Sequence, residues 1–223
     1  MLDFASLREQ GLMLDRVAAL IEKAGLPRDR VLSDPALAQA IAARGETVET
    51  FYYGHDYSAA SLRRFFVLAR ALNAEEMELR ALLEQERWLR PGALGGLISI
   101  PRVGANAFVT AEARATILRH ELSHGEFFTD PAYAGYVWAF WSDELSETER
   151  EAVRRFLASE DYDGGEDELV VNEMQAYLMF TRDPGFFRPA MVGMSPERIA
   201  VIRARFLAGM AEGWLRDVLA REG

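Results

Sequence analysis

Two of the chain's three histidines, His120 and His124, lie four residues apart in the stretch HELSHGEFF. On a helix this spacing places both imidazoles on one face, where they can bind one metal ion at about 2.0 to 2.1 Å. Glu121 lies about 100° further around the helix axis, so its carboxylate can contact a water molecule at that ion without being a ligand. The metal would lower the pKa of water to about 7, and Glu121 would accept its proton. The spacing therefore predicts a metal site suited to hydrolysis.

Three carboxylates compete for the position of the third ligand. The chain contains no cysteine, and a catalytic zinc takes three protein ligands and keeps one open position. Glu126 follows His124 by two residues and lies on the wrong face of the helix. Asp130 follows it by six, where one metalloprotease class places its third ligand after a glycine turn, but Phe127 occupies the glycine position. Asp130 also precedes Pro131, a pairing typical of a helix cap.

Glu173 is the preferred third ligand. It lies with Asn172 among apolar residues in the segment ELVVNEMQAYLMF, a pattern that directs both side chains toward the interior. A buried carboxylate is costly unless it is paired with a cation or bound to a metal. A buried pair of Glu173 with an arginine is one alternative, and Asp130 stays open as the ligand.

The segments HELSH (120–124) and NEMQA (172–176) together resemble the gluzincin metallopeptidases, whose two active-site helices carry His-Glu-x-x-His and Asn-Glu-x-x-Ala motifs. The resemblance implies one zinc ion bound by His120, His124 and Glu173, with Glu121 as general base and acid. It also implies a peptide or protein substrate, in a cleft lined by the strand LISIPRVG (97–104). It does not extend to the first ninety residues.

A tyrosine or histidine commonly stabilises the oxyanion of such a reaction. Tyr177 is the preferred candidate because it follows Glu173 by one helical turn. A core tyrosine whose hydroxyl orients a ligand is the alternative role for it. The other candidates are Tyr133, Tyr136, Tyr162 and His55.

The charge balance bears on the partners. The chain has 35 acidic and 25 basic residues and a net charge of −10, which argues against nucleic acid or an anionic membrane as its partner. Charged residues interrupt the N-terminal apolar run, so neither a signal peptide nor a membrane span is expected. The chain as written would be cytoplasmic, and exported or periplasmic if a leader had been removed.

Apolar residues recur mostly at intervals of three and four, which predicts a mainly α-helical protein of the α+β class. The segment 97–104 is the best strand, with a poorly paired edge expected at Pro101. The segment 48–58 is ambiguous between strand and loop. Helices are expected at 4–24, 34–44, 59–72, 73–89, 110–128, 131–141, 147–159 and 168–180, and from 196 to the C-terminus.

These elements suggest two regions within one compact unit. Residues 1–90 would form an N-terminal helical region, and residues 91–223 a zincin-like catalytic region of two metal-binding helices with a short strand or small sheet. The leading hypothesis is a zinc peptidase. The alternatives are a zinc-dependent hydrolase of a non-peptide amide or ester, and a catalytically silent helical binding protein, which would have no need of Glu121 as a base.

Overall fold

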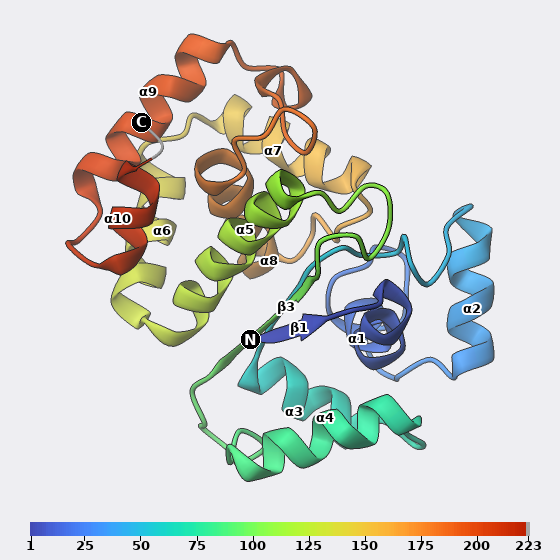
Figure 1. The fold of residues 1–223 in the computed structure, drawn as a ribbon. Coiled ribbons are helices and arrows are strands. Elements are labelled where there is room, and N and C mark those ends of the chain that lie inside the picture. Colours follow the sequence, from blue (N-terminus) through green and yellow to red (C-terminus); the bar gives the residue numbers. More distant parts are fainter. Residues whose placement is uncertain (222–223) are drawn as a thin grey trace.

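A small mixed β-sheet at the centre of the molecule combines two strands from residues 1–90 with one strand from residues 91–223 (Figure 1). In this computed structural model, which describes residues 1–221, the strands are β1 (Leu2–Phe4), β2 (His55–Ser58) and β3 (Gly96–Pro101). Their order is β1-β3-β2, with β1 parallel and β2 antiparallel to β3. A mainly helical chain with one small sheet confirms the predicted fold class.

The strand β3 is the middle strand of this sheet, so the prediction of a poorly paired edge at Pro101 is wrong. Proline is the last residue of β3 and stands opposite Phe4, where its missing N–H interrupts no interior hydrogen bond. The N–H of Arg102 then donates to the carbonyl of Phe4 at 2.7 Å. Burial of β3 between neighbours explains its mostly apolar sequence, and its one polar residue, Ser99, makes buried hydrogen bonds.

Four helices belong to the N-terminal region: α1 (Leu7–Ile21), α2 (Asp34–Ala43), α3 (Ala59–Leu68) and α4 (Ala74–Gln85). The first helix begins later than predicted because Phe4 pairs with β3, and the Ser6 side chain then caps the helix. The helix predicted over 59–72 ends at Leu68, since Ala69 adopts an extended conformation. Asn73 and Glu76 form the expected capping box of α4.

Six helices follow β3: α5 (Ala111–Thr129), α6 (Pro131–Asp143), α7 (Glu147–Ser159), α8 (Asp167–Gln175), α9 (Pro196–Gly209) and α10 (Trp214–Ala220). A π-helical segment, η1 (Ala176–Phe180), continues α8, and a 3₁₀ turn, η2 (Pro189–Val192), precedes α9. The prediction of a single helix from residue 196 to the C-terminus is wrong, because the structure has two helices there, α9 and α10. Met210 is extended and buried in the core, so the chain bends there and α10 starts after Gly213.

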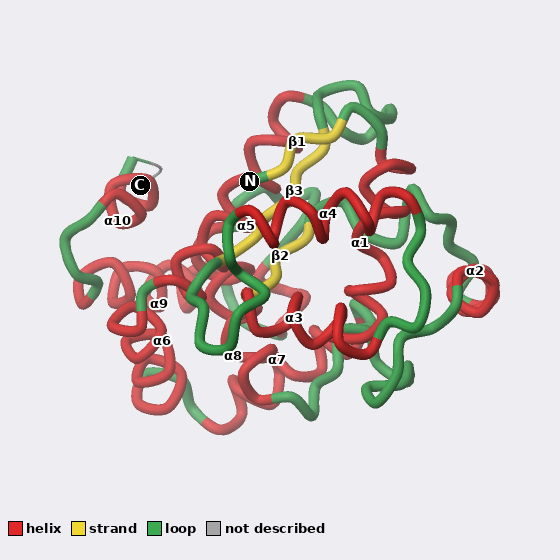
Figure 2. Tube along the Cα trace, turned by 90° about the horizontal axis from the view of Figure 1, so that it is seen from below, coloured by secondary structure: helices red, strands yellow, loops and turns green. Residues whose placement is uncertain are grey.

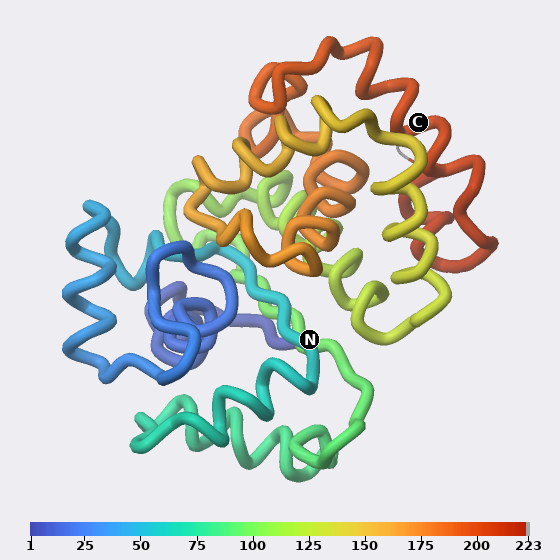
Figure 3. The backbone as a smooth tube through the Cα atoms, turned by 180° about the vertical axis from the view of Figure 1, so that it is seen from behind, coloured from blue at the N-terminus to red at the C-terminus, as the bar shows by residue number. Residues whose placement is uncertain are grey.

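Two hydrophobic clusters hold the helices together. One lies among the N-terminal helices and contains Leu14, Leu62 and Phe65; the other lies among the C-terminal helices and contains Met174 and Phe206. Figure 3 shows the two groups of helices on different sides of the strands, and Figure 2 shows the strands between them. Tyr52 packs against both clusters, so the segment before β2 lies where they meet.

None of the helices within residues 1–221 is both long enough and apolar enough to cross a membrane.

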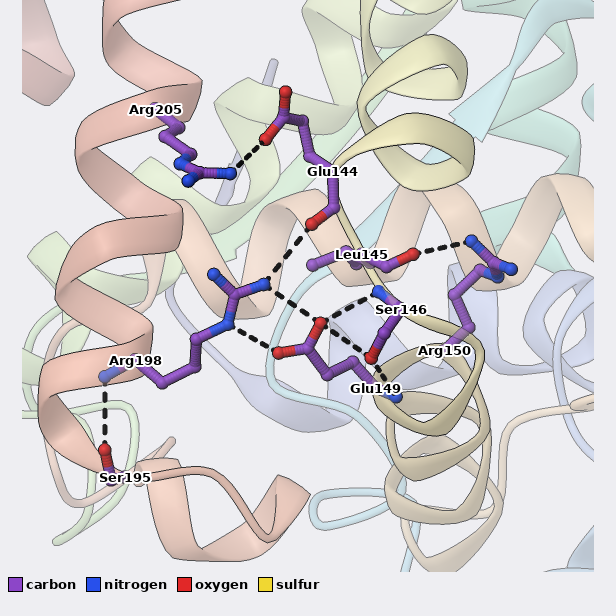
Figure 4. A network of polar contacts seen from close by, with 8 residues as sticks. All are labelled: Glu144, Leu145, Ser146, Glu149, Arg150, Ser195, Arg198 and Arg205. Carbon is purple, nitrogen blue, oxygen red and sulfur yellow. Dashed lines mark hydrogen bonds and ion pairs between the residues drawn. The ribbon is translucent and has the colours of Figure 1, made fainter.

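A polar network joins α7 to α9 at the edge of the C-terminal cluster (Figure 4). The Arg198 guanidinium donates two hydrogen bonds to the Glu149 carboxylate, at 2.6 and 3.0 Å. The Ser146 backbone N–H donates to the same carboxylate at 2.8 Å and completes the capping box of α7. These donors, Arg198 first, lower the pKa of Glu149 to about 2.

Replacing Glu149 by glutamine should therefore destabilise the protein most at neutral pH. The stability that this lowered pKa represents is present above pH 4.5 and lost as the pH falls toward 2, and solvent screening of this surface pair limits it to about 1 kcal/mol. Urea denaturation of both proteins across this range should show their difference in unfolding free energy shrinking with acid. A difference independent of pH would contradict the ion-pair account.

Candidate metal centre

Helix α5 presents His120 and His124 on one face, as their spacing predicts. Thr110 caps the helix through the Ala113 N–H, and the helix packs against β2, β3 and η1. The two imidazole rings lie 4.7 Å apart, with His124 fully buried and His120 partly buried. Burial lowers the pKa of His120 to about 4, so this imidazole is neutral at pH 7, as a metal ligand must be.

Glu173 of α8 completes a three-residue cluster with the two histidines. Its Oε2 lies 3.6 Å from His120 Nε2 and 3.8 Å from His124 Nε2. Two donors bound tetrahedrally to one zinc ion at 2.0 to 2.1 Å are about 3.4 Å apart, so these separations suit a shared cation. Within the described residues, neither Glu173 Oε2 nor His124 Nε2 makes a hydrogen bond, although both are buried. The donor set therefore fits a divalent metal.

The π-helical turn after Glu173 supplies a residue that orients His120. His120 Nδ1 lies 2.9 Å from Thr181 Oγ1, and the Thr181 hydroxyl donates to the Ala176 carbonyl at 3.0 Å. Because its one proton is used there, Thr181 must accept from Nδ1–H, which leaves the Nε2 lone pair of His120 directed at the cluster. Thr181 thus fixes the tautomer needed for metal binding.

Replacing Thr181 by valine, which keeps the shape and removes the hydroxyl, should weaken zinc binding by about 10- to 100-fold. Competition with a chromogenic chelator would measure the dissociation constant. Thr129→Val is a suitable control, because Thr129 is an exposed residue at the end of α5, the helix that carries His120. Equal zinc affinities of the two variants would contradict the orienting role.

Glu121 lies between the cluster and a cleft. Its side chain is buried, packs directly against Gly54, and leaves Oε2 without a hydrogen bond among the described residues. A Cβ at position 54 would collide with the Glu121 carboxylate, so glycine is required there. Burial, followed by the charges of Asp56 and Glu173, holds the pKa of Glu121 well above its usual range.

Two further carboxylates near the cluster had not been singled out in the sequence. Asp56 of β2 places Oδ2 3.6 Å from His124 Nε2 and forms a second cluster with Glu121 and His124. Glu22, at the end of α1, is buried, and its pKa is raised by burial and by the charges of Asp56 and Glu173. Burial, together with the charge of Asp56, also raises the pKa of Glu173 to about 8, and His124 opposes this shift. A cation among these carboxylates would offset their repulsion.

The structure also places the other candidates. Tyr177 lies in the cleft with its ring 4.8 Å from His120, and burial, then the Glu173 charge, raises the pKa of its hydroxyl, which stays a proton donor. Tyr162 lines the same cleft. Asp130 caps α6 through the N–H groups of Ala132 and Tyr133. Glu126 accepts a hydrogen bond from Trp214.

Tyr133 and Tyr136 belong to the C-terminal cluster, where their hydroxyls donate to Gln175 and to the Phe206 carbonyl.

His55 lies in a sealed polar network instead of the cleft. Its Nδ1 is 2.9 Å from Ser99 Oγ, its Nε2 is 3.4 Å from Asp15, and Gln10 also bonds to Ser99. The order Ser-His-Asp is that of a hydrolase triad, but all four side chains are buried and none lines the cleft. The network joins α1, β2 and β3 behind the site.

The cleft is lined by a segment that had not been expected there, residues 50–54. His120, Glu121, Tyr177 and Thr181 line it together with the segment 50–54, which precedes β2. None of the residues 97–104 lines it, so the expectation that this strand borders the cleft is wrong for the described structure. The strand is covered instead by its neighbours β1 and β2 and by α5.

The chain matches no protein-family model, no curated protein and no solved structure.

Proposed function

We propose that this protein is a zinc-dependent peptidase. The observation that carries the proposal is the cluster of His120, His124 and Glu173, whose facing donor atoms lie within 4.8 Å of one another. His120 and the neighbouring Glu121 line a cleft, so the cluster borders that cleft. A purely structural zinc site is closed by four protein ligands and has no use for a base beside it. The His-Glu-x-x-His spacing and the later Asn-Glu pair support the same proposal.

The three ligands would be His120, His124 and Glu173. Bound there, zinc would activate water near neutral pH and polarise the scissile carbonyl. Glu121 would accept the proton of the attacking water and transfer it to the leaving amine. Its raised pKa suits the first of these steps, since it strengthens the carboxylate as a proton acceptor.

Tyr177 would stabilise the developing oxyanion. Its hydroxyl keeps its proton over the physiological range, and the residue lines the same cleft as His120 and Glu121. Peptides fit the cleft because its walls combine apolar rings, such as Phe108 and Phe186, with polar groups. The net charge of −10 supports a substrate other than nucleic acid.

Metal analysis of the purified protein tests the proposal first. We expect one zinc per chain in the wild type and a large loss of zinc in His120→Ala. A mixture of blocked peptides, analysed by mass spectrometry with and without a chelator, should show chelator-sensitive cleavage.

Zinc without cleavage of peptides, but with hydrolysis of other amides or esters, would favour the non-peptide hydrolase. Absence of bound zinc would favour the silent binding protein.

A further inference from the structure

The chain contains a single lysine, Lys23, against 24 arginines, and this lysine lines the cleft of the candidate site. It follows α1 immediately after Glu22, and the residue is 3% exposed. Arginine and lysine both serve as surface cations, and this chain uses arginine at all its remaining basic positions. A lysine that is buried in the cleft is therefore unusual for this chain.

The Lys23 ammonium lacks a counter-ion in direct contact. It lies 4.6 Å from the ring centre of Phe51 and 4.5 Å from that of Tyr52. Within residues 1–221, its Nζ makes neither a hydrogen bond nor an ion pair, and it keeps some contact with solvent in the cleft. Ring contacts of this kind recover only part of the hydration that a buried ammonium loses. The remaining cost falls if an anion binds at the same place.

The residues around Lys23 limit the charge of the anion that it can bind. Glu46 and Glu160 line the same part of the cleft, and with Asp161 they act on Lys23 through space. Burial lowers the pKa of Lys23, while Glu46, Asp161 and Glu22 oppose that shift and help to keep the ammonium charged. Because the same carboxylates repel polyanions, one singly charged group suits the position better than a phosphate does.

Lys23 shares the cleft with the proposed base. His120, Glu121 and Tyr177 line it alongside Tyr52, whose ring contacts the lysine. A peptide held across the metal cluster would therefore extend toward Lys23. Two apolar rings, Phe108 and Phe186, also line the cleft, with their centres 5.2 Å apart.

We infer that Lys23 binds a carboxylate of the substrate and so sets its specificity. That the bound carboxylate belongs to a substrate rests on the proposed peptidase function, whereas the binding of a carboxylate by Lys23 does not. The carboxylate has two possible sources in a peptide, the C-terminal α-carboxylate and an aspartate or glutamate side chain. In either case Lys23 is a binding residue and takes no part in proton transfer.

A binding experiment tests this without turnover. Full-length Glu121→Gln protein, loaded with zinc and produced with lysine labelled with ¹³C at Cε, should give one lysine resonance, since the chain has one lysine. The probes are blocked penta-alanine with a free C-terminus, the same peptide amidated, and amidated peptides with one central aspartate or asparagine. We expect a saturable shift with a carboxylate probe and none with its neutral partner.

The pattern of shifts identifies the source of the carboxylate. A shift only with the free C-terminus would assign Lys23 to the α-carboxylate, and a shift only with aspartate would assign it to an acidic side chain. No shift with any probe, or equal shifts with charged and neutral partners, would overturn the inference. The outcome is independent of whether the wild type cleaves peptides.

Kinetics of charge-changing variants give a second test. Lys23→Met removes the charge at similar volume, and Lys23→Arg retains it. We expect Lys23→Met to raise KM for the carboxylate peptide by about tenfold or more with little change in kcat, because a charge-assisted hydrogen bond is lost. The amidated peptide should be unaffected, and Lys23→Arg should recover part of the loss.

Equal losses on both peptides would overturn the inference and leave Lys23 a structural residue. Zinc content and thermal unfolding of each variant show whether it is folded. If the wild type cleaves neither peptide, the proposed peptidase function fails, and the resonance shift alone decides the role of Lys23.

Discussion

Glu121→Gln should retain zinc and lower kcat by about 10²- to 10⁴-fold. The amide keeps the shape of the side chain and its fit against Gly54, but it cannot accept a proton from water. None of the three proposed ligands changes, so the zinc dissociation constant should stay within a small factor of that of the wild type. Peptide cleavage under saturating substrate and chelator titration measure the two quantities.

The control for this variant is Glu126→Gln, on the same helix. Glu126 contacts Trp214 and does not line the cleft, so kcat should be unchanged. Thermal unfolding separates catalytic loss from misfolding. Because Glu121 is buried beside Asp56 and Glu173, the neutral amide should leave the metal-free protein at least as stable. Full activity of Glu121→Gln would refute the general-base assignment.

Glu173→Gln should weaken zinc binding by more than about 100-fold. The loss of a ligand should exceed the 10- to 100-fold that a missing orienting partner costs. The metal-free variant should be no less stable than the wild type, since burial already raises the pKa of Glu173 to about 8 and the carboxylate is costly without a cation. Chelator competition and thermal unfolding with excess chelator would measure both effects.

Asp130→Ala is the matched comparison, because it tests the alternative third ligand. Its carboxylate caps α6, so the variant should keep its zinc and lose about 0.5 to 2 kcal/mol of stability. A large loss of zinc in Asp130→Ala, with retention in Glu173→Gln, would overturn the proposed ligand set.

Much of the local structure could be predicted from the sequence because its causes are local. Asn73 with Glu76, Ser146 with Glu149, and Asp130 with Pro131 each start a helix where predicted, since a cap depends only on the next three residues. The expected position of β3 at an edge was wrong for the opposite reason. Its partners lie far away in the sequence, since Ser99 pairs with Leu2, 97 residues earlier, and Gly96 pairs with Ser58, 38 residues earlier. No local pattern encodes such pairing.

In the candidate site, too, the local features could be predicted from the sequence and the long-range contacts could not. The spacing of His120, Glu121 and His124 on one helix is a local property, so the sequence alone predicts that the two imidazoles share a face. The placement of Glu173 against them was inferred from a motif, and only the packing of α8 on α5 brings the atoms within reach. The π-helical turn that presents Thr181 to His120 left no sequence signal.

The sequence by itself determined the helical character, most helix boundaries and the two-histidine motif, because each depends on residues within one or two turns of one another. Only the tertiary structure decided that Asp56, Glu22 and Lys23 of the N-terminal region surround that motif. Long-range packing selects such neighbours by shape and burial. A carboxylate or an ammonium acquires its chemistry from the low-polarity surroundings that this packing creates.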